Sequence, residues 1–154
     1  MPAAKTWTYA DNLFYDALLT AINGANDIIE IATFLFRTGY EGDTRSDAIL
    51  DALIAAKLRG VRVLVALDYS RFEPSVASEN FETGQALAAA GCEVRMGPLN
   101  QTLHAKVAII DLTHVFIGSH NITRGALTFN KEITVYSRTR DMRERVGVRE
   151  CFHP

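Results

Sequence analysis

The sequence predicts an α/β fold in which a mixed β-sheet is flanked by helices on both faces. In the first two-thirds of the chain, apolar runs rich in β-branched residues alternate with stretches of helical periodicity, as strands joined by helices do. In the last third, two apolar runs are separated by only three residues, which is typical of an antiparallel hairpin. A chain of 154 residues fits one domain with one core, so we assign residues 1–154 to a single domain.

The expected helices are recognised by the spacing of their apolar residues and by signals at their ends. Residues 9–23 carry apolar side chains at helical spacing and are followed by a glycine. Residues 46–60 begin at a capping serine and end at a glycine, and residues 80–90 are closed by Gly91. A short charged helix is expected from about Asp141.

The expected strands lie between these helices and after them. Two apolar runs, at 27–36 and 61–68, stand on either side of the second helix and give a strand, helix, strand unit. The later strands are expected at 93–96, 103–110, 114–117 and 132–136, with a tight turn at 111–113.

Composition and charge limit the classes of function. Hydrophobic residues make up 48% of the chain and charged residues 22%, a balance that supports a folded core. No apolar run approaches the roughly 18 residues of a membrane span, and no leader pattern is apparent, so we expect a cytoplasmic protein. The formal net charge is −2, but residues 101–154 hold 8 basic and 5 acidic side chains. This local positive charge suits a phosphate-bearing substrate, although a solvated basic helix would give the same pattern.

Two polar pairs in the last third are the candidate functional residues. His104 and Lys106 lie in an expected strand, where alternate residues share one face about 6.6 Å apart, so their side chains point the same way. Ser119 and Asn121 stand in the same relation after the next short strand. The hairpin would bring the two pairs side by side.

The residues around these pairs resemble a known family. The segment His-Ala-Lys-Val-Ala-Ile-Ile-Asp at 104–111 matches the H-x-K-x4-D motif of the phospholipase D superfamily, and Gly-Ser-His-Asn at 118–121 matches its accompanying G-S-x-N. Glu132 stands where a carboxylate follows the motif in the small bacterial nucleases of that superfamily. The run 121–132 resembles nuclease and restriction-associated members more than lipases. The chain holds one copy of the motif, whereas many members hold two.

This resemblance implies a phospholipase D-like fold and a metal-independent phosphodiesterase that needs no cofactor. His104 of one chain would attack phosphorus and His104 of a second chain would protonate the leaving oxygen, because single-motif members pair two chains. Lys106, Ser119 and Asn121 would bind the phosphoryl oxygens, and Glu132 would accept the other ring N–H of His104. Water would then cleave the phosphohistidine. The expected partners are a second copy of the chain and a nucleic-acid substrate, with no membrane.

Other polar residues have less support as functional groups. Asp111 begins the hairpin turn, where aspartate suits the turn geometry, so we assign it a structural role within the motif. His120 should face away from its two neighbours by strand alternation. No pattern of histidines or cysteines predicts a metal site. Candidates for substrate contact in the loops that follow strands are Arg37, Tyr69 and Arg71.

Two other functions remain open on the sequence. A lipid phosphodiesterase or phosphatidyl transferase would use the same motif, but the chain lacks a basic, aromatic amphipathic helix of the kind that binds a membrane surface. A non-catalytic phosphate-binding or dimerisation module would suit the small size and the modest charge. The complete set of histidine, lysine, serine, asparagine and glutamate favours working chemistry. DNA, RNA and lipid substrates are not distinguished by these residues.

Overall fold

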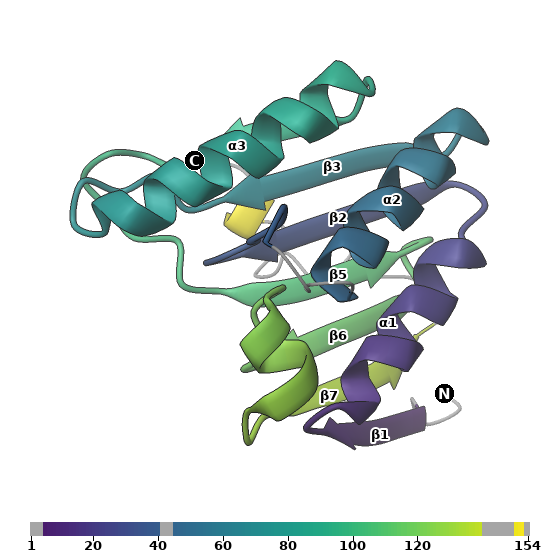
Figure 1. The fold of residues 1–154 in the computed structure, drawn as a ribbon. Coiled ribbons are helices and arrows are strands. Elements are labelled where there is room, and N and C mark those ends of the chain that lie inside the picture. The colour runs from purple at the N-terminus through teal and green to yellow at the C-terminus, as the bar shows by residue number, and fades with distance from the viewer. Residues whose placement is uncertain (1–4, 41–44, 140–149, 153–154) are drawn as a thin grey trace.

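The computed structural model describes residues 5–40, 45–139 and 150–152. All seven strands belong to one mixed sheet with the order β1-β7-β6-β5-β2-β3-β4 (Figure 1). This arrangement confirms the predicted α/β class and mixed sheet. The short helix expected from about Asp141 lies outside the described residues.

One half of the sheet is parallel and the other antiparallel. Strands β2 (Ile28–Thr33), β3 (Arg62–Leu67) and β4 (Glu93–Met96) run parallel, and two helices connect them, α2 (Arg45–Leu58) and α3 (Pro74–Ala89). The antiparallel strands are β5 (Lys106–Ile110), β6 (His114–Gly118), β7 (Ile133–Arg138) and β1 (Lys5–Ala10). Strand β5 pairs antiparallel with β2 and so joins the two halves.

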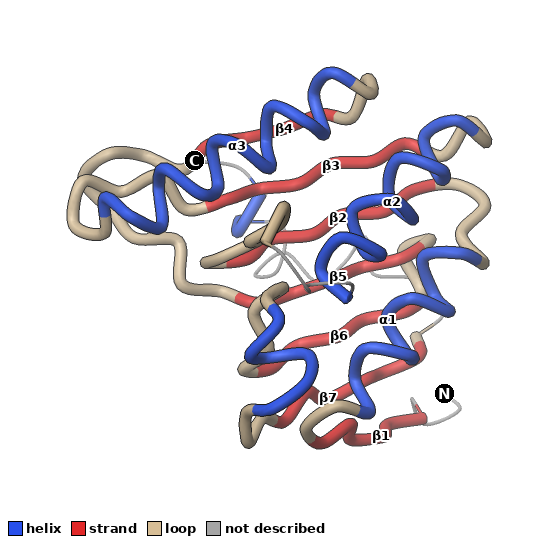
Figure 2. Tube along the Cα trace, viewed as in Figure 1, coloured by secondary structure: helices blue, strands red, loops and turns tan. Residues whose placement is uncertain are grey.

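The sequence predicts helices on both faces of the sheet, whereas the described residues place α-helices on one face and a single 3-10 turn on the other. The helices α1 (Leu13–Asn23), α2 and α3 all lie on one face, as the tube view also shows (Figure 2). On the other face the 3-10 turn Glu150–Phe152 packs its last side chain, which is 1% exposed, against apolar residues of β3, β5 and β6. None of the helices in the described part of the chain is long and apolar enough to cross a membrane.

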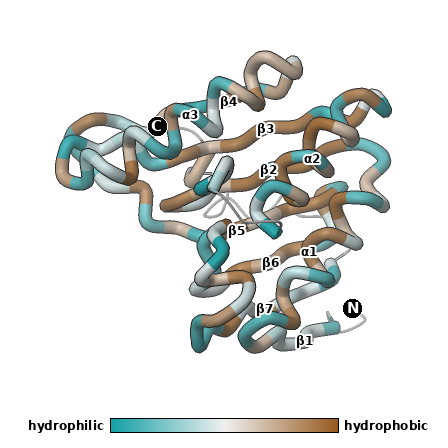
Figure 3. Tube along the Cα trace, viewed as in Figure 1, coloured by the Kyte–Doolittle hydropathy of each residue, from teal (hydrophilic) through white to brown (hydrophobic). Residues whose placement is uncertain are grey.

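The main core lies between the helices and the sheet. Its side chains come from alternate residues of each strand, because successive residues of a strand face opposite sides. Strands β2, β3, β5 and β6 are apolar along most of their length, whereas the loops at the end of the sheet where β2 ends and β5 begins contain more hydrophilic residues (Figure 3). Polar groups near the start of β5 therefore stand at the edge of a rigid apolar layer.

Several elements differ from the sequence prediction. Strand β1 is not predicted by the sequence, which gives no element before residue 9 and places 9 and 10 in the first helix; that helix begins at Leu13. Helix α3 begins at Pro74 rather than near residue 80. Its first turn is largely exposed, so it carries no apolar spacing, although proline at the first helical position is itself a start signal. A π-helical turn, Gly125–Phe129, also separates β6 from β7.

Candidate active site

His104 and Lys106 come together at the start of β5, as their spacing predicts. His104 lies two residues before β5, so it is outside the strand that the sequence predicts at 103–110, and it is exposed. The ammonium of Lys106 lies 3.2 Å from Nδ1 of His104 and donates to the His104 carbonyl at 2.7 Å. Both side chains also contact Phe34, whose ring centroid is 4.8 Å from the imidazole and 5.3 Å from the lysine nitrogen. Phe34 therefore forms an apolar wall beside the pair.

Two influences act in opposite directions on the pKa of Lys106. Burial of the half-buried side chain lowers its pKa, and the negative charge of Glu132 acts in the other direction. The net direction is downward. No hydrogen bond or ion pair joins Lys106 to Glu132 among the described contacts.

Ser119 is held against β7 immediately after β6 ends. Its amide N–H donates to the Ile133 carbonyl at 3.0 Å, and its hydroxyl accepts from the Ile133 N–H at 3.0 Å. The preceding Gly118 permits this close approach, because a Cβ there would lie 2.3 Å from the Ile133 carbonyl oxygen. Only glycine fits without moving a strand, which gives a physical reason for the glycine of G-S-x-N.

Glu132 contacts Ser119 and Asn130 within this chain. The Ser119 hydroxyl donates to one carboxylate oxygen, and the side-chain amide of Asn130 donates to the other at 3.3 Å. No contact between Glu132 and His104 occurs in the described chain. The resemblance implies that Glu132 accepts a ring N–H of His104. That hydrogen bond is not formed among the described residues of this chain.

Asn121 is held by the loop that follows β2. Its side-chain oxygen accepts the Leu35 N–H at 3.2 Å, and this contact assigns the amide orientation because a backbone N–H can only donate. The next residue, Ile122, donates its N–H to the Leu35 carbonyl at 3.0 Å. The NH₂ group of Asn121 therefore remains as the donor of that side chain. Since Phe34 contacts His104, this loop also links the two polar pairs.

Asp111 lies at the opposite end of β5 from His104. Its carboxylate accepts three backbone N–H groups, from Asn26, Asp27 and Ile28, at 2.8–3.0 Å. Burial would raise the pKa of Asp111, but the three donors together outweigh burial and hold it below its usual value. The contacts tie the β5–β6 turn to the start of β2.

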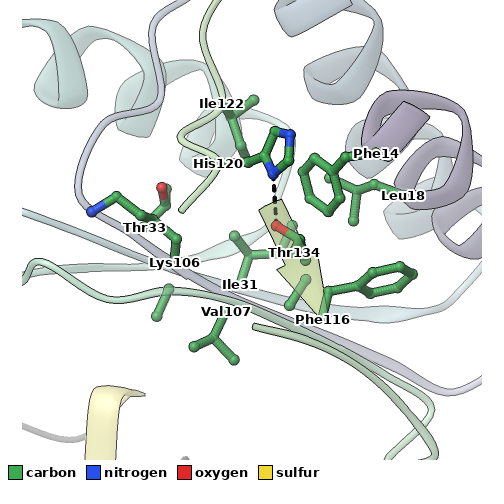
Figure 4. A pocket seen from close by; sticks show the side chains of 12 residues that line it. Phe14, Leu18, Ile31, Thr33, Lys106, Val107, Phe116, His120, Ile122 and Thr134 are labelled. Atoms are coloured by element: carbon green, nitrogen blue, oxygen red, sulfur yellow. Dashed lines mark hydrogen bonds between the residues drawn. The ribbon is translucent and has the colours of Figure 1, made fainter. Parts of the chain in front are cut away.

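His120 and His114 form their hydrogen bonds with residues outside the motif pairs, although His120 and Lys106 line one small cavity. His120 is 3% exposed and lies between the sheet and α1, where Phe14 stacks on it and Thr134 forms a hydrogen bond (Figure 4). His114 forms a hydrogen bond of 2.7 Å with Tyr136. Across the described residues, no three His, Cys, Asp or Glu side chains gather as ligands of one metal ion.

The three loop candidates for substrate contact lie in two different surroundings. Arg37 is ion-paired with Glu79 of α3. Tyr69 and Arg71 line an open groove of about 500 Å³, where the Tyr69 ring lies 6.2 Å from that of Phe81. The backbone of Arg71 donates to Leu99, and the chain continues from there to His104. The groove and His104 thus share one loop.

Three contacts of the site were missed from the sequence. Phe34 gave no signal beyond an apolar strand. Asn130 has a visible signal, because it stands two residues before Glu132 in the run that resembles the nucleases. Asp11 contacts Glu132 across 121 residues of chain, a contact that no local pattern predicts.

Comparison with known proteins places this geometry in a family. The family described as the PLD-like domain of cardiolipin synthase matches residues 18–147. A solved structure with the same fold is Nuc, a phospholipase D family member from Salmonella typhimurium. It aligns with a TM-score of 0.73 and 27% identity over 89% of this chain and 84% of its own.

Curated relatives match over shorter shares of their length. The 5'-3' exonuclease PLD4 of Mus musculus is 28% identical over 128 residues, which cover 76% of this chain and 24% of that protein. A phospholipase D of Rickettsia felis is 34% identical over 100 residues, which cover 64% of this chain and 48% of that protein. The chain therefore spans about a quarter of the first relative and about half of the second.

Proposed function

The chain belongs to the phospholipase D superfamily, and from this we propose that it is a metal-independent phosphodiesterase that hydrolyses nucleic acid through a phosphohistidine at His104. The observation that carries the proposal is the grouping of donors at one edge of the sheet. His104 and Lys106 stand at the start of β5, and Ser119 and Asn121 follow β6, linked by the loop after β2. These groups suit a phosphodiester, which needs a nucleophile and donors for its oxygens.

The reaction divides into two balanced steps. A ring nitrogen of His104 forms a bond to phosphorus while the bond to the leaving oxygen breaks, and the leaving oxygen takes a proton from the partner's His104. Water then attacks phosphorus, the N–P bond breaks, and the proton lost by water returns to the partner's His104. Lys106 supplies positive charge to the non-bridging oxygens in both steps.

The contact of Lys106 with His104 supports a site that two chains complete. A lysine ammonium can only donate, so Nδ1 of a neutral His104 accepts here and the ring proton is on Nε2. Attack by Nε2 requires the other tautomer, with Nδ1–H held by an acceptor. In this chain Glu132 accepts from Ser119 and Asn130, and no described hydrogen bond joins it to His104, so the acceptor would come from a rearrangement or from a second copy. One motif per chain leads to the same requirement, because it supplies one histidine for two roles.

The groove beside the site suits an unpaired strand of nucleic acid. Phe81 is 45% exposed at its rim, Arg71 adds a cation, and single-stranded nucleic acids bind such surfaces by stacking bases on aromatic rings. Replacing Phe81 by alanine should raise KM for a short single strand and leave cleavage of bis(p-nitrophenyl) phosphate unchanged. Leu58→Ala, which removes an exposed apolar side chain at the end of α2, is the matched control.

The test of substrate class uses wild type beside His104→Asn. Single- and double-stranded DNA, RNA and phosphatidyl lipid vesicles are incubated with each protein in excess EDTA. We expect cleavage of nucleic acid by wild type alone, with an acid-labile phosphate label on the protein. Cleavage of lipid alone would make it a phospholipase, and binding without cleavage would make it a phosphate-binding module. Loss of activity with EDTA that Mg²⁺ restores would contradict the metal-independent mechanism.

The test of the dimer uses mixed chains. Sedimentation should show a two-fold dimer, whose interface contains His104. Adding inactive His104→Asn chains in excess should inhibit wild type, because mixed dimers lack either nucleophile or acid. A monomer that stays fully active far below micromolar concentration would disprove this arrangement. Because one imidazole must be neutral and the other protonated, the rate should also fall on both sides of an optimal pH.

A further inference from the structure

Asp11 lies in the turn between β1 and α1, far from the motif in sequence and against it in space. Its φ is +52°, in the left-handed region that aspartate adopts more readily than most side chains. In this conformation its amide, its carbonyl and its carboxylate all contact the segments that carry the polar side chains of the site. The turn thus connects parts of the site that the motif leaves separate.

The first of these contacts fixes the backbone of Glu132. The Asp11 N–H donates to the Glu132 carbonyl at 2.9 Å, and the Glu132 N–H donates to the Asp11 carboxylate at 2.9 Å. Both backbone polar groups of Glu132 are therefore held by one residue. The second carboxylate oxygen of Asp11 accepts from Lys131 at 3.0 Å, but that lysine is 95% exposed, so this ion pair holds little.

The second contact fixes the segment of Ser119 and Asn121 through His120. Nε2 of His120 lies 2.7 Å from the Asp11 carbonyl, which can only accept, so Nε2 carries the proton. Nδ1 then accepts from the Thr134 hydroxyl, also at 2.7 Å (Figure 4). With both nitrogens satisfied in the buried space beside Phe14, the ring cannot turn without losing a hydrogen bond. Its neighbours in the chain are held with it.

We infer that Asp11 is a positioning residue that joins the segment of Ser119 and Asn121 to Glu132 and so sets the spacing of the hydroxyl, amide and carboxylate of the site. Its effect on rate rests on the proposed phosphodiesterase function, whereas the clamp on the Glu132 backbone does not. Catalysis depends on such spacing, because a displacement of about 1 Å can cost about 100-fold in rate.

Three variants separate the carboxylate of Asp11 from its other contacts. Asp11→Gly keeps the left-handed backbone and the carbonyl bond to His120, and it removes the acceptor of the Glu132 N–H. Asp11→Asn keeps that acceptor, and Lys131→Ala removes only the exposed ion pair. With a short oligonucleotide as substrate, kcat should fall about 10- to 100-fold in Asp11→Gly. In Asp11→Asn and Lys131→Ala it should stay near wild type, with circular dichroism confirming the fold of all four proteins.

Hydrogen exchange supplies a readout that does not depend on activity. The Glu132 amide should exchange slowly in wild type, Asp11→Asn and Lys131→Ala, and faster in Asp11→Gly at temperatures well below unfolding. Unchanged exchange in Asp11→Gly would overturn the clamp. Faster exchange with unchanged kcat would overturn the positioning role. If wild type cleaves no phosphodiester at all, the proposed function fails, and the exchange result still decides whether Asp11 holds Glu132.

Discussion

The two ends of strand β5 carry polar residues of one motif and use them in opposite ways. At the first end, His104 is exposed, and its only described hydrogen-bond contact is the Lys106 ammonium. At the other end, both oxygens of Asp111 accept backbone N–H groups at the start of β2. One end of the strand leaves a histidine exposed, where we propose that substrate binds, and the other uses its carboxylate within the fold.

The residues of one motif can therefore serve either the reaction or the stability of the fold. A side chain that has its partners inside the protein contributes to stability, and one that leaves its groups toward solvent can contribute to binding or reaction. Position along β5 decides between these uses, because the polar loops meet at one edge of the sheet and the tight turn lies at the other. Substitutions at the His104 end should therefore change activity, and substitutions at the Asp111 end should change stability.

The largest expected effect is on activity at the His104 end. His104→Asn should lower phosphodiester cleavage by more than about 10,000-fold, because both the nucleophile and the acid of the proposed dimer are lost. Thermal unfolding should be nearly unchanged, since the ring is exposed and contacts only Lys106 and Phe34 among the described contacts. The measurements are cleavage of an oligonucleotide and Tm of the same preparation.

A joint loss of activity and stability in His104→Asn would contradict a purely functional role for this end of β5. A His104→Asn protein that unfolds several degrees lower would mean that the imidazole also supports the fold. His114→Phe is a suitable control, because it removes a histidine whose hydrogen bond is to Tyr136 rather than to the site. Its cleavage rate should equal that of wild type.

The next effect is on stability at the Asp111 end. Asp111→Ala removes three hydrogen bonds to a carboxylate and places alanine at a φ of +52°, so it should lower the free energy of unfolding by about 3 kcal/mol. Asp111→Asn keeps one acceptor oxygen and tolerates the backbone, so it should cost less. Urea unfolding measures both, and kcat per folded molecule should remain within a few-fold of wild type.

Acid should reduce the stability that Asp111 contributes, because the folded state holds the pKa of Asp111 below its usual value. The stability that the carboxylate contributes is complete above its unfolded pKa of about 3.9 and is lost as pH falls through the folded pKa. Wild type should therefore lose stability below about pH 4, and Asp111→Asn should lose less there. Equal losses in the two proteins would assign the acid sensitivity to other carboxylates.

The sequence predicts local relations better than distant ones. The contact of Lys106 with His104 follows from their separation by one residue, even though His104 lies before β5, and the turn at Asp111 follows from three residues between apolar runs. The alternation of helices and strands likewise predicts the parallel half of the sheet. Each of these depends on neighbours within a few residues, where backbone geometry dominates.

The parts that were missed depend on contacts between distant segments. Strand β1 pairs only with β7, more than a hundred residues away, so its stability as an edge strand has no local signal. The role of Asp11 depends on a left-handed backbone and on that same edge. Glu132 was expected to meet His104, and its observed partners, Ser119 and Asn130, follow from how the β6–β7 connection folds back.

The smallest expected effect is the pH dependence of stability through His120, which lies behind the chemical end of β5. Burial lowers the pKa of His120 despite the raising influence of the Asp11 carbonyl and of the charges of Glu132 and Asp11. The folded state thus prefers the neutral ring, while the unfolded chain binds a proton near about pH 6.5. Stability is then complete above that pH and declines as pH falls toward the folded pKa.

His120→Gln separates this proton from the hydrogen bond. Glutamine can still donate to the Asp11 carbonyl but does not titrate, so Tm of the variant should change less between pH 7 and pH 5 than Tm of wild type. His114, whose pKa is also lowered by burial and by Arg138, would contribute in the same window. In His114→Phe, the part of the change in Tm with pH that is due to His120 should therefore remain. If His120→Gln kept the full wild-type slope and His114→Phe removed it, the titrating group would be His114, and the buried ring beside Phe14 would have only a positioning role.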